Sequence, residues 1–203
     1  QLGLRALELA RQTPHPSLMG EAVDTLRAFA MGQGISREVH DGHVPDRSDW
    51  LEHADATTGA LFSFCCRAGV HLAGGDEAQL STLGRFGRHL GRMWHVAEDL
   101  SQLRLGNGVE HLLARACAGR PVLPLILAME SDETLGAGWA ALVHDPTHEA
   151  ATELLARIEQ AGGLEKTRRV LARESWAAQR LANSLPDTPY RKALLKLASS
   201  LAT

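Results

Sequence analysis

The chain has 203 residues, a formal net charge of −3 at pH 7, 44% hydrophobic and 22% charged residues. This composition is ordinary for a globular protein and too apolar for a disordered one. The acidic balance argues against a nucleic-acid binder, which usually carries a basic excess. The longest apolar stretch, residues 121–129, is too short to cross a bilayer, so we predict no membrane span.

Helical periodicity extends along the whole chain, whereas the alternating pattern of strands is nearly absent. Proline and glycine positions divide the sequence into successive segments. We predict one all-α domain over residues 1–203, with about nine helices at 2–12, 17–39, 47–73, 76–105, 109–118, 123–130, 146–161, 164–184 and 188–201. The Gly74-Gly75 pair is typical of a helix C-terminus, and Asp76 can cap the next helix.

The helix predicted at 76–105 would be about 45 Å long, well above the average. It contains Gly84, Gly87 and Gly91, and a glycine inside a helix costs about 1 kcal/mol relative to alanine. Close packing against another helix is the favoured explanation. The alternative is that the glycines leave room for a ligand along the helix.

A polar line follows these glycines on one helix face. Gly91, His95, Glu98 and Gln102 have helical spacing, and Asp99 lies beside the line. Such a line needs either solvent or a polar ligand to satisfy its hydrogen bonds. The pattern alone favours a solvated face over a binding site.

The cysteines Cys65, Cys66 and Cys117 include no C-x-x-C pair, which argues against a disulfide framework or a thiolate zinc site. We predict that they are small buried hydrophobes in a reducing cytoplasm. The remaining candidates also favour ordinary structure: we predict surface positions for the histidine pairs and a core position for one tryptophan. These residues are His40 and His43, His144 and His148, and Trp176.

Four segments resemble motifs of one family, in the order in which that family has them. Residues 83–99 (Leu-Gly-Arg-Phe-Gly-Arg-His-Leu-Gly-Arg-Met-Trp-His-Val-Ala-Glu-Asp) are similar to the helix of trans-isoprenyl diphosphate synthases, or polyprenyl synthetases, that carries their second Asp-rich motif. Residues 30–33 (Ala-Met-Gly-Gln) resemble the family's Gly-Gln segment. Residues 57–62 resemble its Lys-Thr helix start, and residues 118–128 resemble its Gly-Lys segment.

The resemblance implies an isoprenoid-synthase-like bundle, in which long antiparallel helices surround a central cavity. It implies cytoplasmic transfer of isopentenyl diphosphate to an allylic diphosphate, by a homodimer or a pair with a related subunit. In the family two aspartate clusters hold Mg²⁺, because the departing diphosphate must be stabilised by cations. The first cluster would precede Gln1, a residue that is not Met, so we expect that N-terminal helices are missing from this chain.

The resemblance also assigns roles to individual residues. Glu98 and Asp99 match the family's metal ligands. A second group matches positions that bind the diphosphate or the substrate: Gln33, Thr57, Thr58, His95, Gln102 and Arg120. We expect these side chains to share one cleft between the helices that contain residues 57–64 and 91–102.

Six of the matched positions depart from the family's pattern. His95 replaces the motif's glutamine, and Glu98 replaces an aspartate with a longer side chain that can still bind Mg²⁺. Arg120 replaces a lysine, and it keeps a positive charge that can hold phosphate oxygens bidentately. Thr57 replaces a lysine and loses a cation, whereas Gln102 replaces an aspartate and loses an anionic metal ligand. Arg115 most nearly matches a position that is acidic in the family.

Two hypotheses for the function therefore stay open. The replacements favour a degenerate family member that is inactive alone and serves as a partner subunit or a binder of prenyl chains. The alternative is an active trans-prenyltransferase that condenses isopentenyl diphosphate with an allylic diphosphate. That alternative requires an upstream Asp-rich motif and Mg²⁺ at the altered second cluster.

Overall fold

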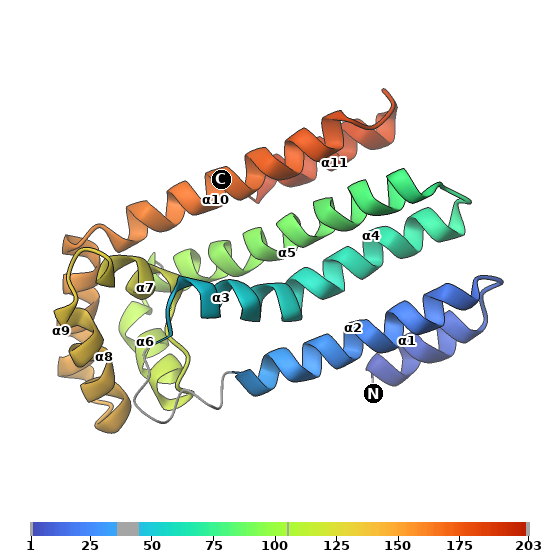
Figure 1. Cartoon of the computed structure of the whole chain (residues 1–203). Coiled ribbons are helices and arrows are strands. Elements are labelled where there is room, and N and C mark those ends of the chain that lie inside the picture. Colours follow the sequence, from blue (N-terminus) through green and yellow to red (C-terminus); the bar gives the residue numbers. More distant parts are fainter. Residues whose placement is uncertain (1, 36–44, 105, 202–203) are drawn as a thin grey trace. The chain divides into compact units, whose positions relative to one another are not determined.

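The computed structural model describes residues 2–35, 45–104 and 106–201 of the chain. These residues form the α-helices labelled in Figure 1, together with one π-helical segment (η2), and they contain no strand. The predicted all-α fold is therefore confirmed. The helices are α1 Leu2–Arg11, α2 Pro16–Ile35, α3 Arg47–Ala54, η2 Asp55–Gly59, α4 Ala60–Leu72, α5 Glu77–Arg104, α6 Gly108–Cys117, α7 Leu123–Met129, α8 Thr134–His144, α9 His148–Gln160, α10 Gly163–Asn183 and α11 Pro189–Ser200.

The chain divides into two compact units, and each unit is made of separated segments. Unit 1 contains Gln1–Gln33, Ala54–Trp94 and Arg173–Thr203, whereas unit 2 contains Gly34–His53 and His95–Ala172. The long helices α5 and α10 each contribute residues to both units. A single domain over residues 1–203 stays a prediction.

The connection between α4 and α5 follows the sequence prediction closely. Gly74 has φ +70°, and the Gly75 N–H donates to the Val70 carbonyl at 2.9 Å, the geometry of a glycine-terminated helix. Asp76 then accepts a hydrogen bond from the Gln79 N–H at 2.8 Å and caps α5. The predicted long helix is one continuous element of 28 residues.

Two helix predictions differ from the structure. The helix predicted at 47–73 is divided by η2, which has π-helical geometry. The sequence analysis missed α8, because Gly136 and Gly138 weaken the local helix propensity. Burial of Trp139 in the core of unit 2 compensates for that weakness. The predicted end of the second helix at residue 39 and the pair His40 and His43 lie outside the described residues.

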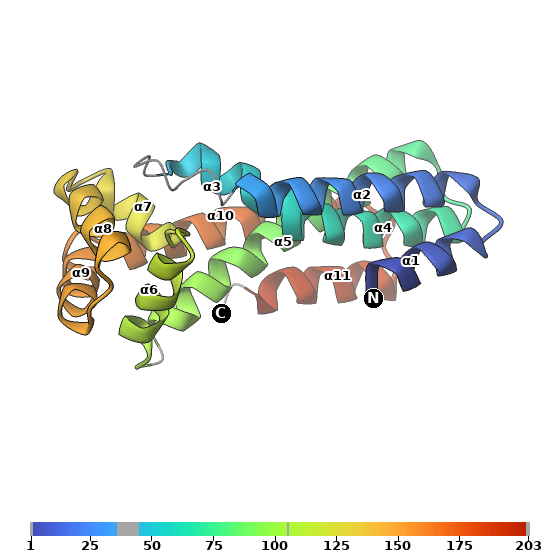
Figure 2. The same cartoon turned by 90° about the horizontal axis from the view of Figure 1, so that it is seen from below.

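In unit 1, glycines let the backbones of two helices approach each other closely. Figures 1 and 2 show α4 beside the first part of α5. A Cβ atom at Gly87 would lie 2.4 Å from the Phe62 carbonyl oxygen, and one at Gly91 would lie 2.6 Å from the Gly59 backbone. Close packing, the favoured explanation for these two glycines, is therefore confirmed.

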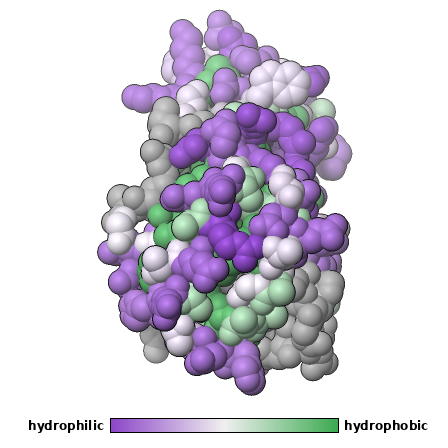
Figure 3. All heavy atoms as spheres, turned by 90° about the vertical axis from the view of Figure 1, so that its left-hand side faces the viewer, coloured by the Kyte–Doolittle hydropathy of each residue, from purple (hydrophilic) through white to green (hydrophobic). Residues whose placement is uncertain are grey.

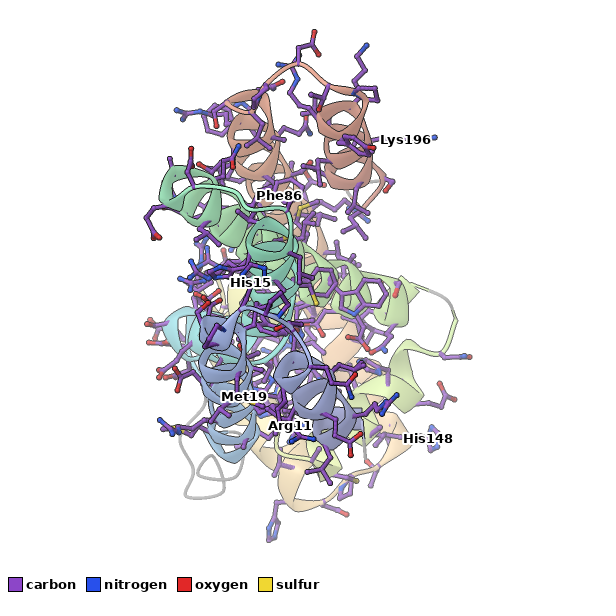
Figure 4. The ribbon with its side chains drawn as sticks, turned by 90° about the vertical axis from the view of Figure 1, so that its right-hand side faces the viewer. Arg11, His15, Met19, Phe86, His148 and Lys196 are labelled. Carbon is purple, nitrogen blue, oxygen red and sulfur yellow. The ribbon has the colours of Figure 1, made fainter. Side chains whose placement is uncertain are left out.

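Side chains on α2 and α4 add a polar tie within unit 1. Arg67 donates two hydrogen bonds of 2.9 Å to the Glu21 carboxylate, and the His71 ring lies 2.9 Å from the same carboxylate. The hydrogen bond from Arg67 outweighs desolvation and lowers the pKa of Glu21. Figure 4 shows the end of unit 1 where His15 lies, and the His15 and His71 rings are 6.4 Å apart. This cluster fixes α2 against α4.

Unit 2 has its own apolar core, built from α6, α7, α8, α9 and the end of α5. Its buried members are Leu103, Leu112, Ala116, Val122, Leu125, Ala128, Leu135, Trp139, Leu142, Ala151, Leu154 and Ile158. The surface drawn in Figure 3 is mainly hydrophilic, with small apolar areas between polar side chains. The amphipathic helices thus bury one face and leave charged residues outside.

The structure corrects two predictions about burial. Cys65 and Cys117 are exposed thiols, so only Cys66 is partly buried as expected. Trp176 is 59% exposed and stacks against Arg180, whose guanidinium carbon lies 4.8 Å from the ring centre. In the amphipathic helix α10, Trp176 lies on the solvent-facing side. The prediction of a core position was wrong because the aromatic character of a residue does not decide which face of its helix it occupies.

The contrast between packed and open glycines gives a stability prediction. Gly87→Ala is expected to cost about 1–3 kcal/mol, because the new methyl group would overlap the Phe62 backbone. Gly20→Ala is the matched control: it is an exposed helical position with nothing within 4 Å, so the same change should gain up to about 1 kcal/mol. Urea unfolding of both variants measures the difference, and equal effects would contradict the packing argument.

Candidate functional site

The residues that the sequence analysis selected are distributed over both units. Gln33, Thr57 and Thr58 belong to unit 1. Unit 2 holds the remaining ones, His95, Glu98, Asp99, Gln102 and Arg120. Their meeting in one cleft stays a prediction.

In unit 1 the two threonines lie in the π-helical turn η2. Thr57 is only 3% exposed, and a Cβ atom at Gly32 would lie 2.9 Å from its Cγ2 atom. The neighbouring Gln33 therefore lies at the same end of α2 as the threonines. Single π-helical turns are rare and often mark functional sites, so this distortion is a structural signal that the sequence pattern did not reveal.

A half-buried charged network in unit 1 includes Asp55 of η2. Arg92 donates two hydrogen bonds of 2.6 Å to Asp55 and lies 3.6 Å from Glu174, whose carboxylate is 2.7 Å from the His89 ring. Burial acts to raise the pKa of Glu174, but the hydrogen bond and charge of His89 and the charge of Arg92 outweigh it and lower the pKa. The sequence analysis drew no inference from His89, because its partner Glu174 is 85 residues away.

Asp99 is a buried carboxylate that several protein donors hold in place. Its side chain is 3% exposed, its Oδ1 accepts a hydrogen bond from Arg115 at 3.1 Å, and its Oδ2 accepts one from the Leu123 N–H at 2.8 Å. Trp50 donates a further hydrogen bond to this carboxylate. Burial raises the pKa of Asp99, while Arg115, Leu123 and Trp50 act in the opposite direction.

These contacts make Asp99 part of the support for α7. All residues from Leu123 to Ala128 are buried, so the free N–H and carbonyl groups at the helix ends need protein partners. Asp99 accepts from the first N–H of α7, and the Lys166 Nζ donates to the Leu127 carbonyl at 2.8 Å. An anion at the N-terminus and a cation at the C-terminus also match the helix dipole.

The turn after α6 positions two arginines of unit 2, Arg115 and Arg120. Gly119 has φ +65°, a conformation that favours glycine. Its N–H donates to Ala116 and the Arg120 N–H donates to Arg115, both at 2.9 Å, the Schellman pattern of helix ends. Arg115 in the last turn of α6 thus lies beside the helix C-terminus, where a positive charge is favoured.

The arginines line a cavity of about 50 Å³ within unit 2. This volume holds a few water molecules. The wall combines polar and apolar residues: Pro45, Asp49, Trp50, His53, His95, Arg115, Gly119, Arg120, Pro121 and Ile126. Asp46 and Asp49 form a reciprocal cap at the start of α3, with bonds of 3.0 and 2.9 Å, and this cap fixes the helix that carries Trp50 and His53.

His95 belongs to this cavity wall rather than to a solvated face. Its ring centre lies 6.2 Å from that of Trp50 and 5.6 Å from that of His53. Burial, together with the charges of His53 and Arg115, lowers the pKa of His95 to about 4. The side chain is therefore neutral at pH 7.

Glu98 and Gln102 occupy a different environment from Asp99. Glu98 is exposed, and its Oε1 accepts a hydrogen bond from the Gln102 Nε2 at 3.2 Å. For these two residues the solvated face favoured by the pattern fits the structure. Adjacent helix residues point about 100° apart, so Glu98 and Asp99 do not converge.

These residues do not fit a Mg²⁺ site of the kind that the resemblance implies. The described part of the chain contains no group of three His, Cys, Asp or Glu side chains that could hold a metal ion. A divalent ion about 4 Å from the Arg115 guanidinium would meet a repulsion of roughly 8 kcal/mol at an effective dielectric constant of about 20. Metal binding by Glu98 and Asp99 stays a prediction that this arrangement does not support. His144 and His148 are exposed, as predicted.

Comparison with known families shows to which family this chain belongs. The model of the family described as "Polyprenyl synthetase" matches residues 2–134 of this chain. The chain belongs to the polyprenyl synthetase family. Among its curated relatives, octaprenyl diphosphate synthase from Haemophilus influenzae is 27% identical over 206 residues, covering 96% of this chain and 60% of the relative.

Solved structures of other family members show the same fold as this chain. A polyprenyl synthase from Roseobacter denitrificans has a TM-score of 0.88 at 19% identity, covering 98% of this chain and 66% of the other. A polyprenyl synthase from Caulobacter crescentus, complexed with calcium and isoprenyl diphosphate, has a TM-score of 0.84 at 25% identity, with coverages of 98% and 62%. The predicted isoprenoid-synthase-like fold is confirmed.

The chain spans about 60% of the length of the curated relative from Haemophilus influenzae. In the described part of the chain, no helix combines the length and the apolar character that crossing a membrane requires.

The low pKa of His95 predicts a pH dependence of stability. The pKa of about 4 in the folded protein lies below the ordinary histidine pKa of 6.5, so the unfolded chain takes up the proton first as the pH falls. His95 makes its full contribution to the free energy of unfolding above about pH 6.5, and about 2 kcal/mol of that free energy is lost by about pH 5. Urea unfolding at both pH values should show that His95→Gln reduces this loss. The exposed-site control His144→Gln should leave it unchanged, and equal pH dependence of both variants would contradict the assignment.

The burial of Asp99 predicts a large effect of its neutralisation. Asp99→Asn is expected to cost about 3–5 kcal/mol, because the amide leaves the Arg115 charge without its counter-charge. Asp132→Asn removes the carboxylate that pairs with Arg157 in the more exposed ion pair of the same unit and should cost less. Chemical denaturation gives both values, and a neutral Asp99→Asn would show that the pair does not stabilise unit 2.

Proposed function

We propose that this chain is a degenerate polyprenyl synthetase, inactive alone, that serves as a partner subunit or a binder of prenyl chains in isoprenoid biosynthesis. The observation that supports this proposal is the ion pair between Asp99 and Arg115. Asp99 matches a metal ligand of the family, and in this chain the Arg115 guanidinium lies beside its carboxylate. Family membership supports the biosynthetic context.

The chemistry of the reaction explains why these replacements matter. An allylic diphosphate leaves only if cations stabilise the charge that develops on it. Thr57 offers no positive charge and Gln102 offers no anionic metal ligand. Both oxygens of Asp99 are also held by protein donors. Each of these differences weakens the stabilisation of the departing diphosphate.

An active trans-prenyltransferase is the second candidate. It is supported by the curated relatives, which are named as synthases of octaprenyl and nonaprenyl diphosphate. The Caulobacter crescentus structure, which holds calcium and isoprenyl diphosphate, also supports it. In this case the chain would use Mg²⁺ and an Asp-rich motif upstream of Gln1. Its substrates would be isopentenyl diphosphate and an allylic diphosphate.

The proposed setting is a cytoplasmic homodimer or a pair with a related prenyltransferase subunit. Arg120 keeps the positive charge of the family's Gly-Lys segment, so the chain retains one group suited to a diphosphate. That group supports binding of a prenyl diphosphate without turnover.

The proposal predicts little or no isopentenyl transfer by the 203-residue chain alone. Loss of one electrostatic stabiliser typically lowers a rate by about 10²–10³, and the effects of residues that act together need not add. The measurement is incorporation of radiolabelled isopentenyl diphosphate with farnesyl diphosphate and Mg²⁺. Octaprenyl diphosphate synthase from Escherichia coli, a curated relative, is the positive control.

Three preparations separate the hypotheses: the chain alone, the full gene product, and a mixture with a co-purifying relative. Activity only in the mixture would identify a partner subunit. Robust turnover by the chain alone would contradict the proposal.

A further inference from the structure

Unit 1 contains a groove at the end where α4 turns into α5 and α10 turns into α11. Its volume is about 550 Å³, within the range of about 300–1,000 Å³ that is typical of small-molecule sites. One wall is α4 with the turn after it and the start of α5, and the other is α11 with the turn before it. Figure 1 shows both turns at the same end of the helices. Among the described residues, the walls contain none of the site residues that the resemblance selected.

The two walls differ in the size of their side chains. The α4 wall includes Cys65, Gly69 and Ala73, whereas the α11 wall includes Leu185 and Leu194. A Cβ atom at Gly69 would have no described heavy atom within 4 Å, so the groove is open beside α4. A molecule that lies against the small residues of α4 can therefore contact the branched apolar side chains of the α11 wall.

Polar side chains in the walls are used within the protein. The Gln79 Oε1 accepts a hydrogen bond from the Asp76 N–H at 3.1 Å. The Thr188 Oγ1 accepts one from the Arg191 N–H at 3.2 Å, and the Arg191 guanidinium pairs with Asp187 at 2.6 Å. Most of the surface that the walls offer to a ligand is apolar, and burial of such surface contributes about 25 cal/mol per Å². The groove is therefore suited to a hydrocarbon rather than to a strongly polar molecule.

We propose that this groove binds the hydrocarbon chain of an isoprenoid and leaves the polar end of that molecule in water. The inference rests on the proposed function, because it assigns the binding of prenyl chains to one place in unit 1. Tyr190 in the α11 wall is 81% exposed, so the groove meets solvent there. A hydroxyl or diphosphate at the chain end keeps its hydration at such an opening, which avoids the cost of burying a polar group.

The first test blocks the groove with a side chain. Gly69→Leu places a leucine in the open space beside α4 and raises the helix propensity, so the variant should fold. Gly20→Leu is the matched control, because Gly20 is also an exposed helical glycine with open space around it, and it does not line the groove. Equilibrium dialysis with radiolabelled farnesol should show a loss of affinity of at least about tenfold in Gly69→Leu only. Farnesol has no diphosphate, so its binding does not depend on Arg120 or on a metal ion.

A second ligand distinguishes an isoprenoid from other hydrocarbons. Farnesol carries methyl branches that dodecanol, an unbranched alcohol of the same main-chain length, lacks. Each buried carbon group contributes about 0.8 kcal/mol, so dodecanol should bind the original chain more weakly than farnesol does. Equal affinities would contradict the assignment to an isoprenoid.

The cysteines give an independent measurement on the original chain. Cys65 is exposed and lines the groove, whereas Cys117 is exposed in unit 2. Burial raises the pKa of the neighbouring Cys66 thiol to about 11, so Cys66 reacts slowly. Saturating farnesol should slow the alkylation of Cys65 by iodoacetamide severalfold and leave that of Cys117 unchanged, as measured by mass spectrometry of the modified peptides.

Three further results would overturn the inference. One is equal farnesol binding by Gly69→Leu and the original chain, and another is an alkylation rate of Cys65 that farnesol does not change. The third is dissociation of a dimer by Gly69→Leu alone in analytical ultracentrifugation, since a second copy of the chain would then cover the groove. None of these readouts measures isopentenyl transfer, so the inference can fail while the chain is inactive, and it can hold while the chain is active.

Discussion

The buried carboxylate of Asp99 is the constraint on which the architecture of unit 2 depends. A charge that is 3% exposed must be compensated by donors and a counter-charge. Here Arg115 comes from α6 and the Leu123 N–H from α7. The same contacts give the first N–H of the buried helix α7 an acceptor and fix Arg115, one of the two arginines that line the cavity. With the further hydrogen bond from Trp50 of α3, this one side chain of α5 contacts three other helices.

This structural use of Asp99 competes with its use in chemistry. A carboxylate that holds a metal ion faces that cation, whereas the Asp99 carboxylate faces the Arg115 guanidinium and accepts the Leu123 N–H. The neighbouring Glu98 faces solvent. The two acidic residues that form one motif in the sequence therefore have separate environments in the structure. This separation is the physical basis for proposing a polyprenyl synthetase without independent catalysis.

Much of the local structure could be predicted from the sequence because it depends on short-range chemistry. The positive φ at Gly74 and the capping bond of Asp76 each require only neighbouring residues. The motifs that indicated the family are likewise short segments in a fixed order, and the family model matches residues 2–134. Helix α8 was not predicted from the sequence, because its stability comes from the buried contacts of Trp139 rather than from the helix propensity of its residues.

The sequence by itself determined that this protein is helical, where most of its helices begin and end, and to which family it belongs. Periodicity, glycine stops and caps act over a few residues, so they can be recognised without a fold. Only the tertiary structure decided that Asp99 is buried against Arg115, that His95 lines a cavity and that Trp176 faces solvent. The physical reason is that burial and pairing depend on segments far apart in the chain, and the desolvation of a charge depends on all of its neighbours at once.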